Sequence, residues 1–188
     1  MKFCSYCGDP VALRVPAGDN RERHICDSCN TIHYHNPRII TGCLPIYGDK
    51  VLLCKRAIEP RREYWTLPAG FMENGESTER GAARESLEEA LAEVTDLQLY
   101  CLYSVPEINQ VFFFYRSRLL REDGFGIGEE SLEVRLFSEE EIPWDQLAFY
   151  TVHKTLKYYF ADRQHNHFPV RDEELIRPPH YKDKTPPR

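Results

Sequence analysis

Long apolar runs are absent from this sequence, and no stretch approaches the roughly 20 residues that a membrane-spanning helix needs. The opening segment, Met1 to Cys7, lacks the apolar core of a secretory signal, so we expect a cytoplasmic protein with no membrane partner. Positive charge is also scarce, because 24 Lys and Arg face 30 Asp and Glu, for a formal net charge of −6. This balance disfavours a general nucleic-acid binder.

The chain does contain enough apolar material for a folded core. Hydrophobic residues make up 41% and aromatic residues 12% of its 188 residues, which excludes a disordered or collagen-like chain. This length suits one domain with a small appendage. We predict a small metal-binding module over 1–35, a main domain over 36–162, and a polar, proline-rich tail over 163–188 that is either disordered or laid over a surface.

Four of the seven cysteines form two Cys-x2-Cys pairs separated by eighteen residues: Cys4, Cys7, Cys26 and Cys29. This spacing is typical of a structural Zn²⁺ site with four thiolates, and a reducing compartment disfavours disulfides between them. The runs 11–15 and 23–25 predict two strands of a ribbon. His33 and His35 follow closely, but four thiolates already complete a tetrahedral site.

The charge of this module argues against a nucleic-acid clamp. Residues 1–40 carry five basic and four acidic side chains, and zinc with four thiolates adds about −2. We therefore expect a structural module or an oligomer contact.

The main domain has the pattern of an α/β (α+β) fold with a mixed sheet flanked by helices. Strands over 38–47 and 50–56 enclose Gly48-Asp49, which predicts a hairpin. Further strands are predicted over 64–68, 97–105, 111–120 and 132–137. Helices are predicted over 77–94 and 145–162.

The first predicted helix concentrates carboxylates, because at 100° per residue Glu85, Glu88 and Glu89 share one face. The opposite face, which we expect to be buried, holds Ala83, Leu87, Ala90 and Val94. Carboxylates three and four residues apart repel one another, so a cation should compensate them, and oxygen ligands suit Mg²⁺ or Mn²⁺. A solvated acidic face is the alternative.

Residues ahead of this helix extend the pattern. Five residues separate Gly70 from Glu76, seven more lead to Arg84-Glu85, and Glu88-Glu89 follow two residues later. This spacing closely resembles the Nudix box, with every charged position filled. The chain departs from the box at Ser86, which replaces an aliphatic residue, and at Leu91, which replaces the closing glycine. We predict from Leu91 that the helix runs on for about one more turn.

The resemblance implies a Nudix α/β/α sandwich that hydrolyses a nucleoside diphosphate linked to another group, using a divalent metal. Its implied metal ligands are Glu85, Glu88 and Glu89, with the backbone carbonyl of Ala69 as a further one. Such metal ions would bridge the acidic site to an anionic pyrophosphate and lower the pKa of a bound water. Arg84, paired with Glu76, is implied to orient the glutamates.

The zinc ribbon ahead of the box is similar to the NADH pyrophosphatases, although their Ser-Gln-Pro-Trp-Pro-Phe signature is absent. The stretch 129–137 is more similar to FAD or ADP-ribose diphosphatases. In this branch a glutamate ahead of the last strand joins the metal site or acts as the base. Glu130 matches that position best, with Glu129 and Glu133 as rivals.

Two residues outside the acidic helix are predicted to bind substrate. Phe71 follows the first box glycine and suits stacking on a base or flavin, although filling the core is an equal alternative. Arg56 ends a predicted strand and is favoured over Arg61 and Arg62 for contact with phosphate.

We therefore predict a Mg²⁺- or Mn²⁺-dependent Nudix pyrophosphatase acting on FAD, ADP-ribose or NADH, with AMP and the phosphorylated remainder as products. The family resemblance implies a homodimer. A non-catalytic nucleotide sensor and an RNA cap-removing enzyme are the alternatives, and net charge weighs against the second.

Overall fold

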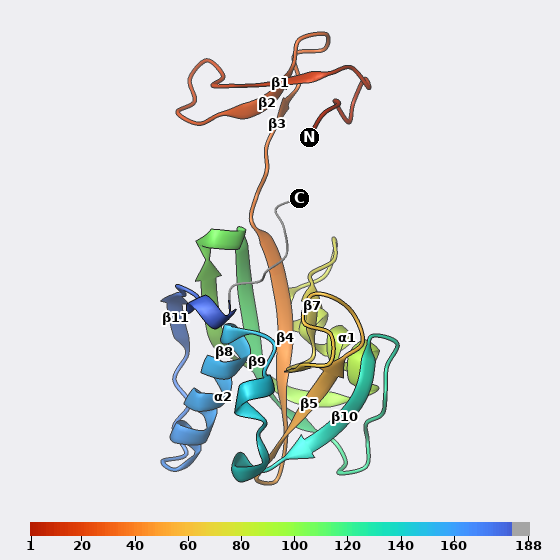
Figure 1. Cartoon of the computed structure of the whole chain (residues 1–188), viewed down its shortest axis with the longest axis vertical. Helices are drawn as coiled ribbons and strands as arrows, with labels where there is room; N and C mark the ends of the chain where they lie inside the picture. The colour runs from red at the N-terminus through yellow and green to blue at the C-terminus, as the bar shows by residue number, and fades with distance from the viewer. Residues whose placement is uncertain (182–188) are drawn as a thin grey trace. The chain divides into compact units, whose positions relative to one another are not determined.

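The computed structural model describes residues 1–181, and its contacts divide the chain into two units, with the boundary between Pro37 and Arg38 (Figure 1). The first unit holds an antiparallel sheet of β1 (Val11–Arg14), β2 (Arg23–Cys26) and β3 (Ile32–His33). The two predicted ribbon strands are confirmed as β1 and β2, and β3 adds a short third strand. The last part of the predicted tail, 182–188, lies outside the described residues.

The second unit is built on a mixed sheet with strand order β10-β5-β4-β9-β8-β11, with β6 pairing with β5 and β7 with β4. The pairs β4/β9 and β8/β11 are parallel and the other pairs are antiparallel. Its strands are β4 (Arg38–Tyr47), β5 (Lys50–Arg56), β6 (Trp65–Thr66), β7 (Ala69–Phe71), β8 (Val94–Val105), β9 (Gln110–Leu119), β10 (Ser131–Phe137) and β11 (Arg171–Glu174). The mixed sheet and the hairpin at Gly48-Asp49 are confirmed.

Helices α1 (Thr78–Ala90) and α2 (Tyr150–Arg163) cover opposite faces of this sheet. Side chains alternate between the faces along β5, as they must in a strand. Leu52 and Cys54 pack with Ala90 of α1, whereas Leu53 packs in the cluster that holds Leu156 of α2. The result is the expected α/β/α arrangement. Neither helix of the described residues has the length and apolarity needed to span a bilayer.

Four 3-10 turns complete the described elements: η1 (Pro106–Ile108), η2 (Glu139–Glu141), η3 (Trp144–Gln146) and η4 (Pro179–Tyr181). The prediction that the second helix begins at residue 145 is wrong, because α2 begins at Tyr150. Residues 144–146 form the turn η3 instead, and Leu147 and Phe149 are extended. Leu147 forms a parallel bridge with Trp65, and the Ala148 N–H donates to the Trp65 carbonyl at 2.8 Å. Pairing with β6 therefore replaces the first turn of the predicted helix.

The described part of the polar tail joins the main domain, because β11 pairs with β8 and Leu175 after it is buried in the core. Its charged residues are paired with α2: Glu173 contacts Lys154 and accepts from Tyr158 at 2.6 Å, and Arg171 donates to Asp162 at 2.7 Å. Side-chain pairing with a neighbouring helix thus holds a strand that contains no apolar residue.

The prediction that the acidic helix continues past Leu91 is also wrong. Leu91 adopts a left-handed conformation with φ of 48°, and its N–H donates to the Leu87 carbonyl at 2.9 Å. The chain thus turns where the box has glycine, although a side chain in this conformation is strained by about 1–2 kcal/mol.

Replacing Leu91 with glycine should therefore stabilise the protein. We expect a net gain of about 0.5 kcal/mol, since glycine removes the strain but has more conformational freedom to lose on folding. That gain corresponds to a rise in Tm of about 1–2 °C by differential scanning calorimetry. Leu91→Ala keeps the Cβ and is the control, and an equal rise in that variant would contradict the strain argument.

Candidate active site

A cavity of about 1120 Å³ opens in the second unit, between the start of α2, helix α1 and strands β4, β7 and β9. This volume exceeds the roughly 300–1,000 Å³ of pockets that hold drug-sized ligands. Its lining combines carboxylates, arginines and aromatic rings. The predicted site residues that line it are Arg56, Ala69, Gly70, Phe71, Arg84, Glu85, Glu88, Glu89 and Glu130.

Helix α1 presents Glu85, Glu88 and Glu89 to this cavity, whereas the face that it buries differs from the predicted one. It begins after Ser77, whose hydroxyl accepts from the Arg80 N–H at 3.2 Å. The predicted apolar face is wrong, since Leu87 is 49% exposed. The buried residues are Gly81, Ala82, Glu85, Ser86, Glu89 and Ala90.

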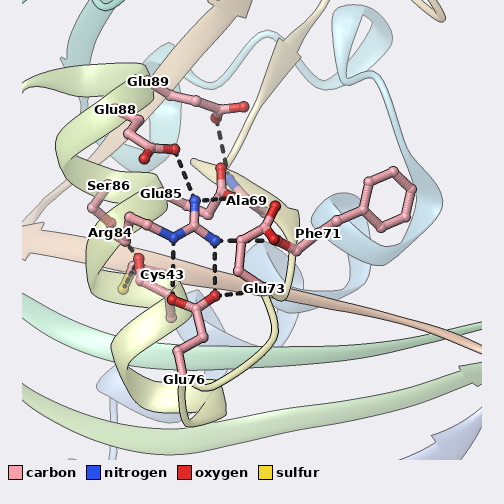
Figure 2. Close-up of polar contacts among 11 residues, drawn as sticks. Cys43, Ala69, Phe71, Glu73, Glu76, Arg84, Glu85, Ser86, Glu88 and Glu89 are labelled. Atoms are coloured by element: carbon pink, nitrogen blue, oxygen red, sulfur yellow. Dashed lines mark hydrogen bonds and ion pairs between the residues drawn. The ribbon is translucent and has the colours of Figure 1, made fainter.

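Small side chains explain why this other face of α1 is buried, because they let the helix backbone approach β4 closely. The Cys43 thiol of β4 donates to the Ala82 carbonyl at 3.3 Å, and the Ser86 hydroxyl donates to the same carbonyl at 3.1 Å (Figure 2). An aliphatic side chain in place of Ser86 would add volume at this contact. Burial of this face also buries two carboxylates, those of Glu85 and Glu89.

Glu85 and Glu89 are 7% and 6% exposed, respectively. The Ala69 N–H donates to Glu89 Oε2 at 3.1 Å, so β7 holds this carboxylate (Figure 2). Burial raises the pKa of Glu89 to about 8, and burial also raises the pKa of Glu85. A Cβ on Gly70 would overlap the Glu85 carboxylate, which gives the first box glycine a physical role.

Arg84 connects these carboxylates to the loop after β7. Its Nη1 donates to Glu85 Oε1 and Glu88 Oε2, both at 2.8 Å, and its Nε and Nη2 hold Glu76 at 3.1 and 2.9 Å (Figure 2). The expected pair of Arg84 and Glu76 is therefore present. Nη2 also donates to the Phe71 carbonyl at 3.1 Å, so a single guanidinium joins the loop to the helix.

The loop between β9 and β10 docks on the end of α1. Its Gly126 N–H donates to the Ala90 carbonyl at 2.7 Å, and its Gly128 N–H donates to the Glu89 carbonyl at 3.1 Å. A Cβ on Gly128 would overlap the Glu88 carbonyl, so only glycine permits this approach. These bonds satisfy helix carbonyls that have no partner within the helix.

This docking brings Glu130 to the cavity. Its charge raises the pKa of Glu85 and of Glu89, although burial makes the larger contribution to both shifts. Of the two rivals, Glu129 also lines the cavity, whereas Glu133 lies on β10 outside the lining.

The predicted substrate-binding residues lie on other walls. Arg56 is buried, donates to the Pro60 carbonyl at 2.9 Å, and its guanidinium lies 5.1 Å from the centre of the Phe149 ring. Phe71 is 48% exposed and lies outside the core clusters, with the Arg38 guanidinium 5.0 Å from its ring centre. An exposed ring with one open face suits stacking better than core filling.

Several lining residues were not identified from the sequence. They are Arg38, Phe112, Phe149, Tyr150, Thr151, Arg177 and Tyr181. Most belong to strands or helices whose periodicity predicts burial without indicating a cavity. Arg177 and Tyr181 lie in the tail, where the sequence predicts no site, and no spacing in the sequence connects them to the box.

The acidic wall fits divalent cations by charge and by ligand type. Carboxylates outnumber arginines in the lining, so negative charge is in excess. The four arginines are Arg38, Arg56, Arg84 and Arg177, and the seven glutamates are Glu59, Glu73, Glu85, Glu88, Glu89, Glu129 and Glu130. All donors are oxygens, as Mg²⁺ and Mn²⁺ prefer. Among the described residues only the four cysteines bring three or more ligand atoms within 4.8 Å of one another. Arg84 and the Ala69 N–H engage one oxygen each of Glu85, Glu88 and Glu89, so the second oxygen of each carboxylate would be left to hold a metal.

The four predicted zinc ligands cluster in the first unit. The Sγ atoms of Cys7 and Cys26 are 3.4 Å apart and those of Cys4 and Cys29 are 3.7 Å apart. A tetrahedron with Zn–S bonds of about 2.3 Å places sulfurs about 3.8 Å apart, so the cluster fits zinc. His33 contacts Cys4 Sγ at 3.3 Å through Nε2 but lies outside the four-sulfur group.

Comparisons with known proteins agree with both units. A model of the Nudix N-terminal zinc ribbon matches residues 2–35, and a model of the NUDIX domain matches residues 36–174. The second match covers most of the chain, so this chain belongs to the Nudix family.

The crystal structure of a NUDIX hydrolase from Nitrosomonas europaea is 54% identical and superposes with a TM-score of 0.87 over 93% of this chain and 100% of that one. Human mitochondrial NAD(P)H pyrophosphatase NUDT13 is 37% identical over 105 residues, 56% of this chain and 28% of that protein. The NAD-capped RNA hydrolase NudC of Edwardsiella ictaluri is 35% identical over 99 residues, 52% of this chain and 36% of that protein. The chain thus spans about a third of the length of these curated relatives.

The buried Glu89 carboxyl predicts a pH-dependent stability. Its folded pKa of about 8 lies above the ordinary value of 4.5, so its stabilising effect is complete below about pH 4.5 and is lost as pH rises through 8. Without added Mg²⁺ or Mn²⁺, the advantage of Glu89→Gln over wild type in unfolding free energy should grow by on the order of a few kcal/mol across this range. Urea titrations at several pH values measure it, and a constant difference would contradict the shift.

Zinc removal should act on the first unit alone. We expect one zinc per chain by elemental analysis, and we expect chelation to unfold residues 1–37, because four thiolates without metal repel one another and this unit has little core. Amide NMR signals of the first unit should collapse while those of residues 38–181 persist. Collapse of both sets would show that the larger unit depends on the metal.

Proposed function

We propose that this chain hydrolyses the pyrophosphate of a nucleoside diphosphate-linked metabolite, with Mg²⁺ or Mn²⁺ at the acidic wall and Zn²⁺ held structurally by the four cysteines. The observation that carries the proposal is the pair of buried carboxylates, Glu85 and Glu89, lining a cavity large enough for a dinucleotide. Burying two acids is costly unless a cation compensates them. A homodimer and a cytoplasmic location, both expected from the sequence, belong to the same proposal.

In this mechanism Glu85, Glu88, Glu89 and the Ala69 carbonyl hold the metal ions, which supply Lewis acidity and a water of lowered pKa when bound. Arg84 positions Glu85 and Glu88 through one guanidinium. Glu130, brought in by the loop after β9, is the proposed base or additional ligand. Arg56 contributes positive charge beside Glu89, since its charge lowers the pKa of that carboxyl.

FAD, ADP-ribose and NADH are the proposed substrates, with AMP and the phosphorylated remainder as products. Phe71 would stack on a base or flavin, and the guanidinium of Arg38 already lies over its ring. The name of the human relative, an NAD(P)H pyrophosphatase, adds support for NADH.

Removal of an NAD cap from RNA is a second candidate, favoured by the relatives named NAD-capped RNA hydrolase. The excess of acidic residues in the chain does not favour contact with a long RNA. A non-catalytic sensor is less well supported, because every charged position of the box is filled.

The proposal is tested with Mg²⁺ or Mn²⁺ by measuring AMP release from FAD, ADP-ribose and NADH. For a short NAD-capped RNA the product measured is nicotinamide mononucleotide, because the adenosine of the cap stays joined to the RNA. We expect a preferred substrate among the first three, and we expect Glu89→Gln to lower kcat by several orders of magnitude with the fold intact. Glu130→Gln should lower kcat by about 10²–10⁴-fold if it acts as general base.

Glu133→Gln is the matched control, because it makes the same chemical change outside the cavity and should leave kcat unchanged. Full activity in Glu89→Gln would show that the reaction does not depend on the Glu89 carboxylate. Tight binding of one nucleotide without turnover would support the sensor, and hydrolysis of the capped RNA alone would support the second candidate.

A further inference from the structure

The C-terminal segment after β11 forms part of the cavity wall. Arg177 and Tyr181 line the cavity, whereas the match to the NUDIX domain ends at residue 174. Neither the box nor the zinc ribbon accounts for a wall built by this segment. This part of the wall therefore lies beyond the part of the chain that the family pattern describes.

Contacts along its length attach this segment to the domain. Leu175 is 2% exposed and belongs to the largest core cluster. Arg177 Nε donates to the Glu107 carboxylate at 3.1 Å, and Arg61 Nη2 donates to the His180 carbonyl at 2.9 Å. A chain end is poorly ordered unless such contacts tie it down, so the segment reaches the cavity along a defined path.

At Tyr181 the segment packs against a second tyrosine of the cavity. The ring centres of Tyr181 and Tyr150 are 5.4 Å apart, both residues line the cavity, and both are only half-buried. The centre of the His153 ring lies 6.1 Å from each of these two ring centres, and His153 is not part of the lining. His153 therefore supports the two tyrosine rings from outside the cavity, and their accessible surface is available to a ligand.

Phe71 offers an aromatic surface at another place in the same cavity. It belongs to β7, and its ring points away from the carboxylates of α1 (Figure 2). Its partner is the Arg38 guanidinium, 5.0 Å from the ring centre, and in the described part of the chain no ring contact joins Phe71 to Tyr150 or Tyr181. The cavity thus has two separate aromatic surfaces, one from the box and one from the tail.

We propose that Tyr181 stacks on one aromatic ring of the substrate while Phe71 stacks on the other. Flat rings of any kind stack on aromatic side chains, so two surfaces suit a diphosphate with a ring at each end. FAD and NADH have this form, whereas ADP-ribose carries only its adenine. The inference rests on the proposed function for the identity of the ligand, and it adds a specificity-determining residue from the tail.

The two halves of FAD, which are FMN and AMP, measure the two stacking contacts separately. Ribose 5-phosphate shares their phosphate and lacks a ring, so the ratio of each affinity to that of ribose 5-phosphate reports the contribution of the ring. Affinities are measured by calorimetry with Mg²⁺ on the full, zinc-loaded chain. We expect FMN and AMP each to bind at least about tenfold more tightly than ribose 5-phosphate.

Three variants assign each ring contribution to a residue. Tyr181→Leu should remove about tenfold of the preference for one of the two probes, because leucine has no flat ring to stack. Phe71→Leu should do the same for the other probe. Tyr181→Phe keeps the ring and should retain both preferences. The affinity for ribose 5-phosphate should stay the same in all three variants, and urea titrations should show that each is folded.

Three results would overturn the inference. Tyr181→Leu could keep both ring preferences, which would show that Tyr181 does not stack. It could weaken all three probes equally, which would show that Tyr181 only maintains the shape of the cavity. Tyr181→Leu and Phe71→Leu could also weaken the same probe, which would show that there is one aromatic subsite and not two.

Turnover separates this failure from failure of the proposed function. We expect a kcat/KM for FAD or NADH about tenfold above that for ADP-ribose, and an equal or higher value for ADP-ribose would contradict the preference for two rings. Hydrolysis of a dinucleotide without a ring preference that depends on Tyr181 would overturn the stacking role alone. A ring preference that depends on Tyr181 without hydrolysis of any dinucleotide would overturn the proposed function and leave the stacking role.

Discussion

The guanidinium of Arg84 is the contact on which the acidic wall depends. It holds Glu76 on the loop after β7 and both Glu85 and Glu88 on α1, and it also donates to the Phe71 carbonyl. A planar group with five donors reaches partners in several directions at once, which an ammonium cannot do with the same fixed geometry. Without this cation, neighbouring carboxylates on the helix would repel one another and the loop would lose its attachment.

Close backbone approach supplies the second constraint. Gly70 and Gly128 lie where a Cβ would overlap the Glu85 carboxylate and the Glu88 carbonyl, and Ala82 and Ser86 keep α1 close to β4. Packed backbone thus acts together with the Arg84 guanidinium to fix the positions of the carboxylates. This explains how two acids remain buried in a protein that is otherwise rich in exposed charge.

Much of the fold and of the acidic wall was predictable because it is encoded locally. The spacing from Gly70 to Glu89, the cysteine pairs and the hairpin each depend on residues that are near in sequence. The end of α1 was not predictable, since Leu91 takes a conformation that glycine normally adopts. The loop after β9 also caps the helix there, because the Gly126 N–H donates to the carbonyl of Ala90, 36 residues earlier. The walls of the cavity formed by Phe149 and Tyr181 were not predictable either. The position of Phe149 depends on pairing with β6 and that of Tyr181 on the path of the tail, and no local sequence pattern indicates either.

The acidic wall limits what the cavity can bind. It repels a pyrophosphate unless cations stand between them, because charges interact strongly where little water is present. Arg56 offsets part of this negative charge, since its own charge lowers the pKa of Glu89, while its guanidinium lies 5.1 Å from the centre of the Phe149 ring. An anionic ligand would therefore need cations at α1 before it could approach Glu85 and Glu89.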